Sequence, residues 1–218
     1  MYHYIFFDLD GTLTDSKEGI LKNVRYALEK LGRPVPGDDI LTLFVGPPLA
    51  DSFMNFCGMT RTEADEAVRV FRERYAAKGL FENAAVPGGP ELLRRLKERG
   101  YVLALASSKP VEHCRPIVER FGYAPYLDVV AGSEGESDET KADIIRKAMA
   151  QLGITQAEKP RVLMVGDRKF DVLGARECGI DCVGLEVCRY GRPGELAEAG
   201  AVAVLESMDA LEDFILSH

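Results

Sequence analysis

Residue types that mark metal-binding or disulfide-linked proteins are scarce in this chain. Its three histidines, His3, His113 and His218, lie far apart, so a compact histidine ligand set such as many zinc sites use is not expected. The five cysteines are an odd number, and no Cys-x-x-Cys pair occurs among them. The sequence therefore predicts reduced thiols and no disulfide framework.

Long apolar runs and an excess of positive charge are also absent. No run approaches the ~20 apolar residues of a membrane span, and we expect no leader before the first predicted strand. The formal net charge of −8 disfavours a nucleic acid polymer or an anionic membrane as a partner held by bulk charge. With 46% hydrophobic and 28% charged residues, the chain is expected to be a soluble, cytoplasmic, globular protein.

The first strong pattern is the apolar run from Tyr4 to Phe7, which is rich in aromatic and β-branched residues and predicts a buried strand. It ends at Asp8 and Asp10, which Gly11 follows. Buried carboxylates are costly unless something uses their charge. The carboxyl ends of parallel strands face a shared crevice, so we expect both aspartates to do chemistry there.

Residues 15–85 show helical spacing of apolar residues, and we expect no strand from Asp15 to Ala84. Asp15 and Ser16 offer an N-cap for the first helix of this segment. The clearest boundary signal follows, in the run 86–90, Val-Pro-Gly-Gly-Pro. Residues 1–14 and 86–218 are therefore expected to form one α/β domain, with 15–85 inserted as an all-α domain.

After the boundary, strands alternate with helices. This alternation predicts a Rossmann-like, doubly wound parallel sheet with helices on both faces. The expected strands are 101–106, 127–131, 162–165, 181–185 and 201–205, and the expected helices are 91–99, about 111–121, 141–152, 170–178 and 208–216.

Polar residues stand at the ends of these core elements and could meet in one crevice. They are Asp8, Asp10, Ser107, Lys141, Asp167 and Asp171. Two like charges 4 Å apart repel by ~1 kcal/mol in water and ~4 kcal/mol at an effective dielectric of 20. Clustered carboxylates therefore call for a cation, and a set of oxygen ligands suits Mg²⁺, which a substrate phosphate can share.

Each of these residues also has an ordinary alternative. Ser107 could be a turn residue, and Lys141 an exposed lysine at a helix start. Asp167 could cap a helix, and Asp171 could be a solvated carboxylate in its first turn. The functional interpretation is favoured because all of them occur together.

The motif from Asp8 to Thr14 resembles the nucleophile motif of the haloacid dehalogenase superfamily. Ser107 resembles the second motif of that family, Lys141 the third, and the run from Gly166 to Asp171 the fourth, in the same order. The helical insert stands where the family carries a cap domain. The pattern is most similar to the phosphoglycolate phosphatase-like branch with a helical C1 cap, and the run 46–49, Gly-Pro-Pro-Leu, favours its 5′-nucleotidase-like members.

This resemblance implies a Mg²⁺-dependent phosphatase that forms an aspartyl-phosphate on Asp8. Asp10 would be the acid and base and would meet the metal through its backbone carbonyl. Asp8 and Asp167 would bind the metal by side chain. Asp171 would be a partner of Lys141 or of a metal-bound water, with direct ligation left open.

The resemblance also implies a phosphate cradle made by the side chains of Ser107 and Lys141 and the amides of Leu9, Asp10 and Ser108. Candidate substrate contacts from the insert are Lys22, Arg25 and Gly46.

Other functions stay open at this stage. Dehalogenases lack the second aspartate, so phosphoryl transfer is favoured. A β-phosphoglucomutase-like transferase and a non-catalytic phosphometabolite-binding module are the alternatives. The expected partner is a small phosphorylated metabolite, which could be phosphoglycolate, a nucleotide, pyrophosphate or a sugar phosphate. A monomer or a homodimer is expected.

Overall fold

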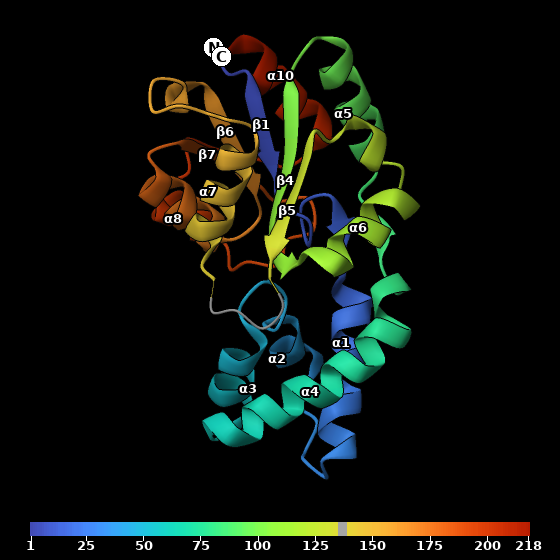
Figure 1. The fold of residues 1–218 in the computed structure, drawn as a ribbon. Helices are drawn as coiled ribbons and strands as arrows, with labels where there is room; N and C mark the ends of the chain where they lie inside the picture. Colours follow the sequence, from blue (N-terminus) through green and yellow to red (C-terminus); the bar gives the residue numbers. More distant parts are fainter. Residues whose placement is uncertain (135–138) are drawn as a thin grey trace. The chain divides into compact units, whose positions relative to one another are not determined.

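The computed structural model describes residues 1–134 and 139–218 (Figure 1). The chain divides into two compact units, one formed by Met1–Thr14 with Ala85–His218 and the other by Asp15–Ala84. Among the described residues, no helix has both the length and the apolar character needed to cross a membrane.

The larger unit is built on a six-stranded sheet in which every pair of neighbouring strands is parallel. The strand order is β5-β4-β1-β6-β7-β8. The strands are β1 (Tyr4–Phe7), β4 (Val102–Pro110), β5 (Val129–Ser133), β6 (Val162–Gly166), β7 (Asp181–Leu185) and β8 (Ala203–Leu205). The prediction of a doubly wound α/β fold is confirmed.

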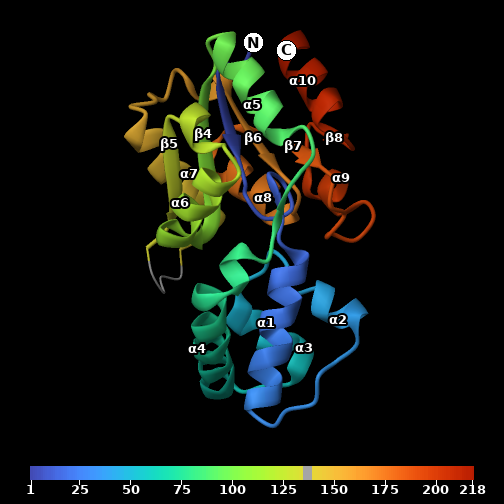
Figure 2. The same cartoon turned by 90° about the vertical axis from the view of Figure 1, so that its right-hand side faces the viewer.

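Helices cover both faces of this sheet (Figures 1 and 2). On one face, α7 packs over β4 and β5, while α8 packs over β6 and β7 with α9 beside it; on the other face, α5 and α6 pack, with α10 against α5. The helices are α5 (Gly89–Glu98), α6 (Val111–Arg120), α7 (Lys141–Gln151), α8 (Lys169–Cys178), α9 (Glu195–Ala199) and α10 (Met208–Ser217), and the 3₁₀ turns are η2 (Ala124–Tyr126) and η3 (Lys159–Arg161).

The strand register brings the functional motifs to one edge of the sheet. Phe7, the last residue of the central strand β1, pairs with Leu105 of β4 and with Val165 of β6. The amide of Asp8 continues this ladder and donates to the carbonyl of Val165 at 2.9 Å. Polar residues that follow this level on all three strands therefore lie at the same carboxyl edge.

Several elements of this unit differ from the expected ones; β5, for example, covers Val129–Ser133, where we expected a strand over 127–131. Strand β4 continues to Pro110 and includes Ser107, with a register shift between Ala106 and Pro110, where we expected the strand to end at residue 106. Helix α9 was not predicted, because its five residues are too few to show a helical period.

The smaller unit is helical, and its longest helices, α1 and α4, pack along each other. Its elements are α1 (Lys17–Lys30), α2 (Asp38–Thr42), α3 (Leu49–Cys57), α4 (Arg61–Ala77) and η1 (Gly79–Phe81). Thr60 and Glu63 form a capping box that starts α4. Ser16 stands at the N-cap position of α1, but its side chain makes no capping hydrogen bond there; instead Asp15 accepts from the amide of Lys17 at 3.2 Å.

Two short strands correct the expectation that no strand occurs from Asp15 to Ala84. Strand β2 (Thr14–Asp15) pairs with β3 (Ala84–Ala85). Both contain the points at which the chain passes from one unit to the other. Strands of two residues were not predicted, because they are too short to show an alternation of apolar and polar residues in the sequence.

Candidate active site

The turn after β1 is closed by its own hydrogen bonds. The carbonyl of Leu9 accepts from the amides of Leu13 and Thr14, each at 2.9 Å. The amide of Gly11 donates to the carbonyl of Thr14 at 2.7 Å. Because these bonds fix the backbone, the carboxylates on either side of Leu9 leave the turn in defined directions.

A second turn, after β6, packs directly against the first. Gly11 has a φ of +87°, and a β-carbon there would lie 2.1 Å from Oδ2 of Asp167. Thr12 donates its hydroxyl to Oδ1 of Asp167 at 3.3 Å. Gly166 is similarly constrained, since a β-carbon there would lie 2.2 Å from Cγ of Asp171. Glycine at position 11 permits the close approach of the two turns, and glycine at position 166 leaves room for the side chain of Asp171 within the second turn.

Three buried carboxylates gather where these turns meet. Asp8, Asp167 and Asp171 each offer an oxygen within 4.8 Å of the others. Lys141, the first residue of α7, places its Nζ 2.8 Å from Oδ1 of Asp8 and 2.8 Å from Oδ1 of Asp171. The same ammonium donates to the carbonyl of Ala106 at 3.1 Å. Lys141 is therefore a buried counter-ion and not an exposed lysine at a helix start.

The electrostatics of this cluster leave it short of positive charge. Three carboxylates and one ammonium carry a formal sum of −2. Burial raises the pKa of Asp167 well above its usual value, and the neighbouring carboxylates of Asp171 and Asp8 raise it further. Burial alone would lower the pKa of Lys141, but the charges of Asp171 and Asp8 outweigh it and hold that pKa above its usual value.

A divalent cation fits this cluster. Oδ2 of Asp167 is buried and has no hydrogen-bond partner among the residues that the structure describes. Three carboxylates form an all-oxygen donor set, which suits hard cations such as Mg²⁺. The formal deficit of two positive charges matches one such ion.

Asp10 stands apart from the three clustered carboxylates. Its Oδ1 accepts a hydrogen bond from Nζ of Lys109 at 2.7 Å. Lys109 lies two residues beyond Ser107, which is buried and accepts from the amide of Lys109 at 3.4 Å. No role was expected for Lys109 from the sequence. The only sequence signal for such a role was a lysine near the end of β4. That signal was not enough, because the contact of this lysine with Asp10 depends on the pairing of β4 with β1.

A buried ion pair, also missed from the sequence, supports the turn after β6. Nε of Arg168 donates to Oε1 of Glu195 at 2.9 Å, and the amide of Lys169 donates to the same oxygen at 3.1 Å. Burial would raise the pKa of Glu195, but these two donors hold it below its usual value. The pair connects the residue after Asp167 to the start of α9.

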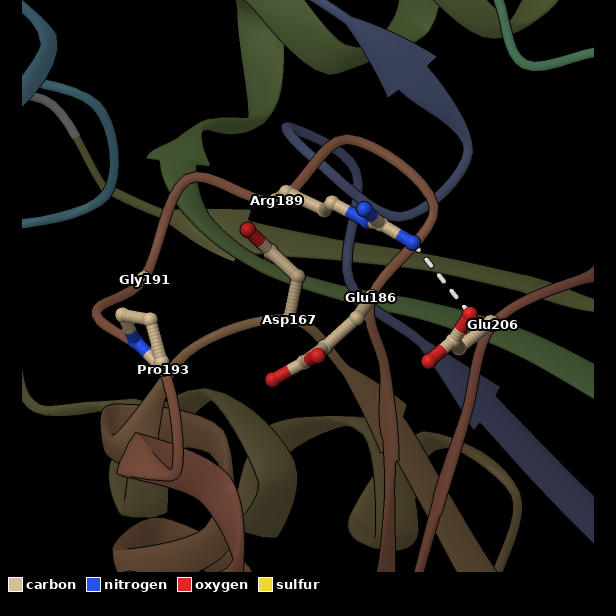
Figure 3. Close-up of a pocket in the computed structure, with 6 residues that line it drawn as sticks. All are labelled: Asp167, Glu186, Arg189, Gly191, Pro193 and Glu206. Carbon is tan, nitrogen blue, oxygen red and sulfur yellow. Dashed lines mark hydrogen bonds and ion pairs between the residues drawn. The ribbon is translucent and has the colours of Figure 1, made fainter.

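A cavity of about 250 Å³ lies beside Asp167 (Figure 3). Arg189, which has a φ of +53°, spans it and donates to Oε2 of Glu206 at 3.2 Å. We expected Asp8, Ser107, Lys141 and Asp167 to surround one cavity, and this one includes only Asp167. Its lining residues are Asp167, Glu186, Arg189, Gly191, Pro193 and Glu206.

The residues predicted to contact substrate from the helical unit are part of its surface. Lys22 forms ion pairs with Glu18 and Glu82, and Arg25 pairs with Asp38. Gly46 has a φ of +104° in the turn between α2 and α3. The two cations thus have acidic partners within their own unit, and their role toward substrate stays a prediction. Of the predicted phosphate cradle, Leu9 is buried and Ser108 is exposed.

The family of haloacid dehalogenase-like hydrolases matches this chain over residues 5–185. The chain belongs to this family. The predicted resemblance to the haloacid dehalogenase superfamily is thus confirmed, and so is the prediction of a hydrolase.

Three curated relatives of this haloacid dehalogenase-like hydrolase have been named for their activities. A 5′-nucleotidase of Pseudomonas aeruginosa is 38% identical over 100% of this chain and 97% of its own length. The tyrosine-protein kinase PtkA of Mycobacterium tuberculosis is 39% identical over 82% of this chain and 60% of its own. A phosphoglycolate phosphatase of Cupriavidus necator is 31% identical over 95% of this chain and 90% of its own.

A solved structure shows the same fold. The crystal structure of a predicted phosphatase from Clostridium acetobutylicum is 40% identical to this hydrolase. It superposes with a TM-score of 0.92, and the match covers 100% of both chains.

Proposed function

We propose that this hydrolase is a Mg²⁺-dependent phosphatase that cleaves a small phosphomonoester through an aspartyl-phosphate on Asp8. The observation that carries the proposal is the buried cluster of Asp8, Asp167 and Asp171 around Lys141, with its formal deficit of two positive charges. Relatives named 5′-nucleotidase and phosphoglycolate phosphatase support the same reaction class.

Side-chain oxygens of Asp8 and Asp167 and the backbone carbonyl of Asp10 would hold the metal, with Asp171 beside Lys141. When bound, the ion supplies charge neutralisation and polarises a phosphoryl oxygen as a Lewis acid. The close packing of the two turns through Gly11 keeps Asp167 next to the nucleophile, and no residue that the structure describes forms a hydrogen bond to its Oδ2. That oxygen is the strongest candidate for a ligand atom.

The chain's own residues account for both halves of the reaction. In the first, a carboxylate oxygen of Asp8 forms a bond to phosphorus while the bond to the leaving oxygen breaks, and Asp10 gives that oxygen its proton. In the second, Asp10 takes a proton from water, whose oxygen attacks the phosphorus and releases Asp8. Lys141 balances charge on Asp8, and the hydroxyl of Ser107 donates to a phosphoryl oxygen.

Substrate choice is proposed to lie with the helical unit Asp15–Ala84, acting as a cap. The 5′-nucleotidase of P. aeruginosa matches this chain over its full length, so nucleoside monophosphates are the first substrates to test. Phosphoglycolate comes next, followed by pyrophosphate and hexose phosphates. Transfer of the phosphoryl group to a sugar hydroxyl, as in a mutase, would appear in the same assay as an isomerised sugar phosphate.

The test is phosphate release from this panel by the wild-type protein with Mg²⁺ and with EDTA, and by Asp8→Asn. Asp65→Asn is the matched control, because it removes an exposed carboxylate on α4 that pairs with Arg61. We expect turnover that requires Mg²⁺, is lost in Asp8→Asn and is retained in Asp65→Asn. Phosphate release that persists in Asp8→Asn would refute the mechanism, and ligand binding without turnover would favour a binding module.

A further inference from the structure

The contact between Lys109 and Asp10 is mostly shielded from solvent. The side chain of Lys109 is 8% exposed and that of Asp10 is 16% exposed, and Nζ lies 2.7 Å from Oδ1. A bond between a charged donor and a charged acceptor is among the stronger hydrogen bonds in proteins. Because little solvent reaches it, the bond is screened less than a surface ion pair would be.

The backbone that carries Lys109 is itself held from three sides. Its amide donates to Oγ of Ser107 at 3.4 Å, and its carbonyl accepts from Sγ of Cys114 at 3.5 Å. A β-carbon at Gly132 of β5 would lie only 2.6 Å from that carbonyl oxygen, so β5 packs closely on this segment. The ammonium therefore extends from a fixed origin, as a positioning group requires.

Each of the two aspartates of the first motif forms an ion pair with a different lysine. Lys141 contacts Asp8 and Asp171, and Lys109 contacts Asp10. The carboxylate of Asp10 is not one of the three that gather within 4.8 Å. The neighbouring aspartates thus have different counter-ions, although only Leu9 separates them.

We propose that Lys109 is a positioning residue that holds the carboxyl group of Asp10 ready for proton transfer. This inference rests on the proposed phosphatase function. An unpaired carboxylate next to a cation site is attracted to the cation, and once bound there it no longer serves as an acid. The hydrogen bond from Lys109 opposes that attraction and keeps Asp10 available to the leaving oxygen and then to water.

The effect of losing the contact between Lys109 and Asp10 should depend on the leaving group of the substrate. A nitrophenolate departs without help from an acid, whereas an alkoxide departs only as it receives a proton. Misplacement of Asp10 should therefore slow the first half-reaction for alkyl phosphates and spare it for p-nitrophenyl phosphate. The second half-reaction needs Asp10 as a base for both esters, so the aspartyl-phosphate should accumulate.

The experiment compares wild type, Lys109→Met and Lys109→Arg on p-nitrophenyl phosphate and on an alkyl phosphate that the wild type cleaves. We expect Lys109→Met to lose ~10²-fold in kcat/KM for the alkyl ester and far less for the nitrophenyl ester. Rapid mixing should show a burst of nitrophenolate that wild type lacks. Lys109→Arg should restore part of the loss, and inhibition by inorganic phosphate should stay within about twofold of wild type.

Other outcomes would overturn the inference. Equal losses on both esters, no burst, or much weaker inhibition by phosphate would assign Lys109 to phosphate binding instead. Unchanged kinetics in Lys109→Met would remove any role. Circular dichroism establishes whether each variant is folded. If Lys109→Met does not fold, Lys109→Arg tests the contact between position 109 and Asp10 instead. If the wild-type protein shows no turnover, or turnover that does not depend on Asp8, the proposed function is refuted and this inference falls with it. If the wild type is active and depends on Asp8, the variants at position 109 test the role of Lys109 separately.

Discussion

Gly11 and Asp167 approach each other so closely that a β-carbon on Gly11 would stand 2.1 Å from Oδ2 of Asp167. No real β-carbon tolerates that distance, so any side chain at Gly11 must displace the carboxylate or the turn. The same carboxylate is the strongest candidate ligand for the metal. The glycine therefore links the backbone of the nucleophile turn to the geometry of the cation site.

Gly11→Ala should damage the site beyond the effect of backbone strain, and Gly32→Ala provides the control. Gly32 also has positive φ, +64°, but a β-carbon there meets nothing within 4 Å. The control should cost about 1–2 kcal/mol in the free energy of unfolding and keep turnover. Gly11→Ala should cost more and should raise the Mg²⁺ concentration needed for half-maximal turnover. Urea unfolding and Mg²⁺ titration check both, and equal behaviour of the two variants would contradict the prediction.

Asp167→Asn should separate stability from metal binding. The substitution removes a buried carboxylate whose Oδ2 has no hydrogen-bond partner in the described part of the chain, so the metal-free variant should melt at a higher temperature than metal-free wild type. Mg²⁺ should stabilise wild type, by about 2.7 kcal/mol at a hundred times its Kd. The variant should gain little from Mg²⁺. Thermal melting in EDTA and in excess Mg²⁺ gives both results, and a full Mg²⁺ gain in the variant would exclude Asp167 as a ligand.

Lys141→Met should destabilise the metal-free protein, because it leaves Asp8 and Asp171 buried without their counter-ion. Breaking a buried ion pair from one side costs about 3–5 kcal/mol. Arg146→Met, on the same helix, removes an exposed arginine that pairs with Asp143 and Glu177 and should cost less than about 1 kcal/mol. Denaturant unfolding of both variants in EDTA measures the difference. If the two variants lose a comparable free energy of unfolding, Lys141 does not stabilise the buried carboxylates more than a surface ion pair would.

The pH dependence of stability should contain a contribution from Glu158. Hydrogen bonds from the amide and hydroxyl of Thr155, and then from the hydroxyl of Tyr4, lower the pKa of Glu158 to about 2. Because the folded pKa lies below the unfolded value of ~4.3, the contribution is complete above that value and is lost as the pH falls toward 2. Glu158→Gln should therefore differ most from wild type at neutral pH, and least near pH 2.

Urea unfolding between pH 7 and pH 2 measures this difference, and Glu66→Gln, at an exposed glutamate of α4, is the control. A gap between wild type and Glu158→Gln that stays constant across this range would contradict the assignment.

The fold was predictable where the sequence carries long patterns. The apolar run Tyr4–Phe7 marks β1 at its observed bounds, and the strand predicted over 181–185 is β7 as observed. Elements without a readable period were missed. Two-residue strands such as β2 and a five-residue helix such as α9 owe their conformation to tertiary contacts, which no local pattern reports.

The candidate site was predictable as far as its motifs reach. Asp8, Lys141 and Asp171 were singled out from the sequence, and their side chains meet. The contact of Lys109 with Asp10 was not foreseen, because it depends on the register of β4 against β1. Glu195 was missed for a similar reason, since its partner Arg168 comes from a different strand–helix connection.

The central place of β1 has a consequence for how the chain acquires its structure. The neighbours of β1 are β4 and β6, and the whole segment Asp15–Ala84 is synthesised before either of them. In a nascent chain, one edge of strand β1 (Tyr4–Phe7) therefore stays unpaired until β4 has been synthesised. The other edge stays unpaired until β6 has been synthesised. Such late, long-range pairing slows folding and leaves an apolar strand open to association with other chains. The strand that leads to the nucleophile thus stays unpaired while the whole inserted unit is synthesised.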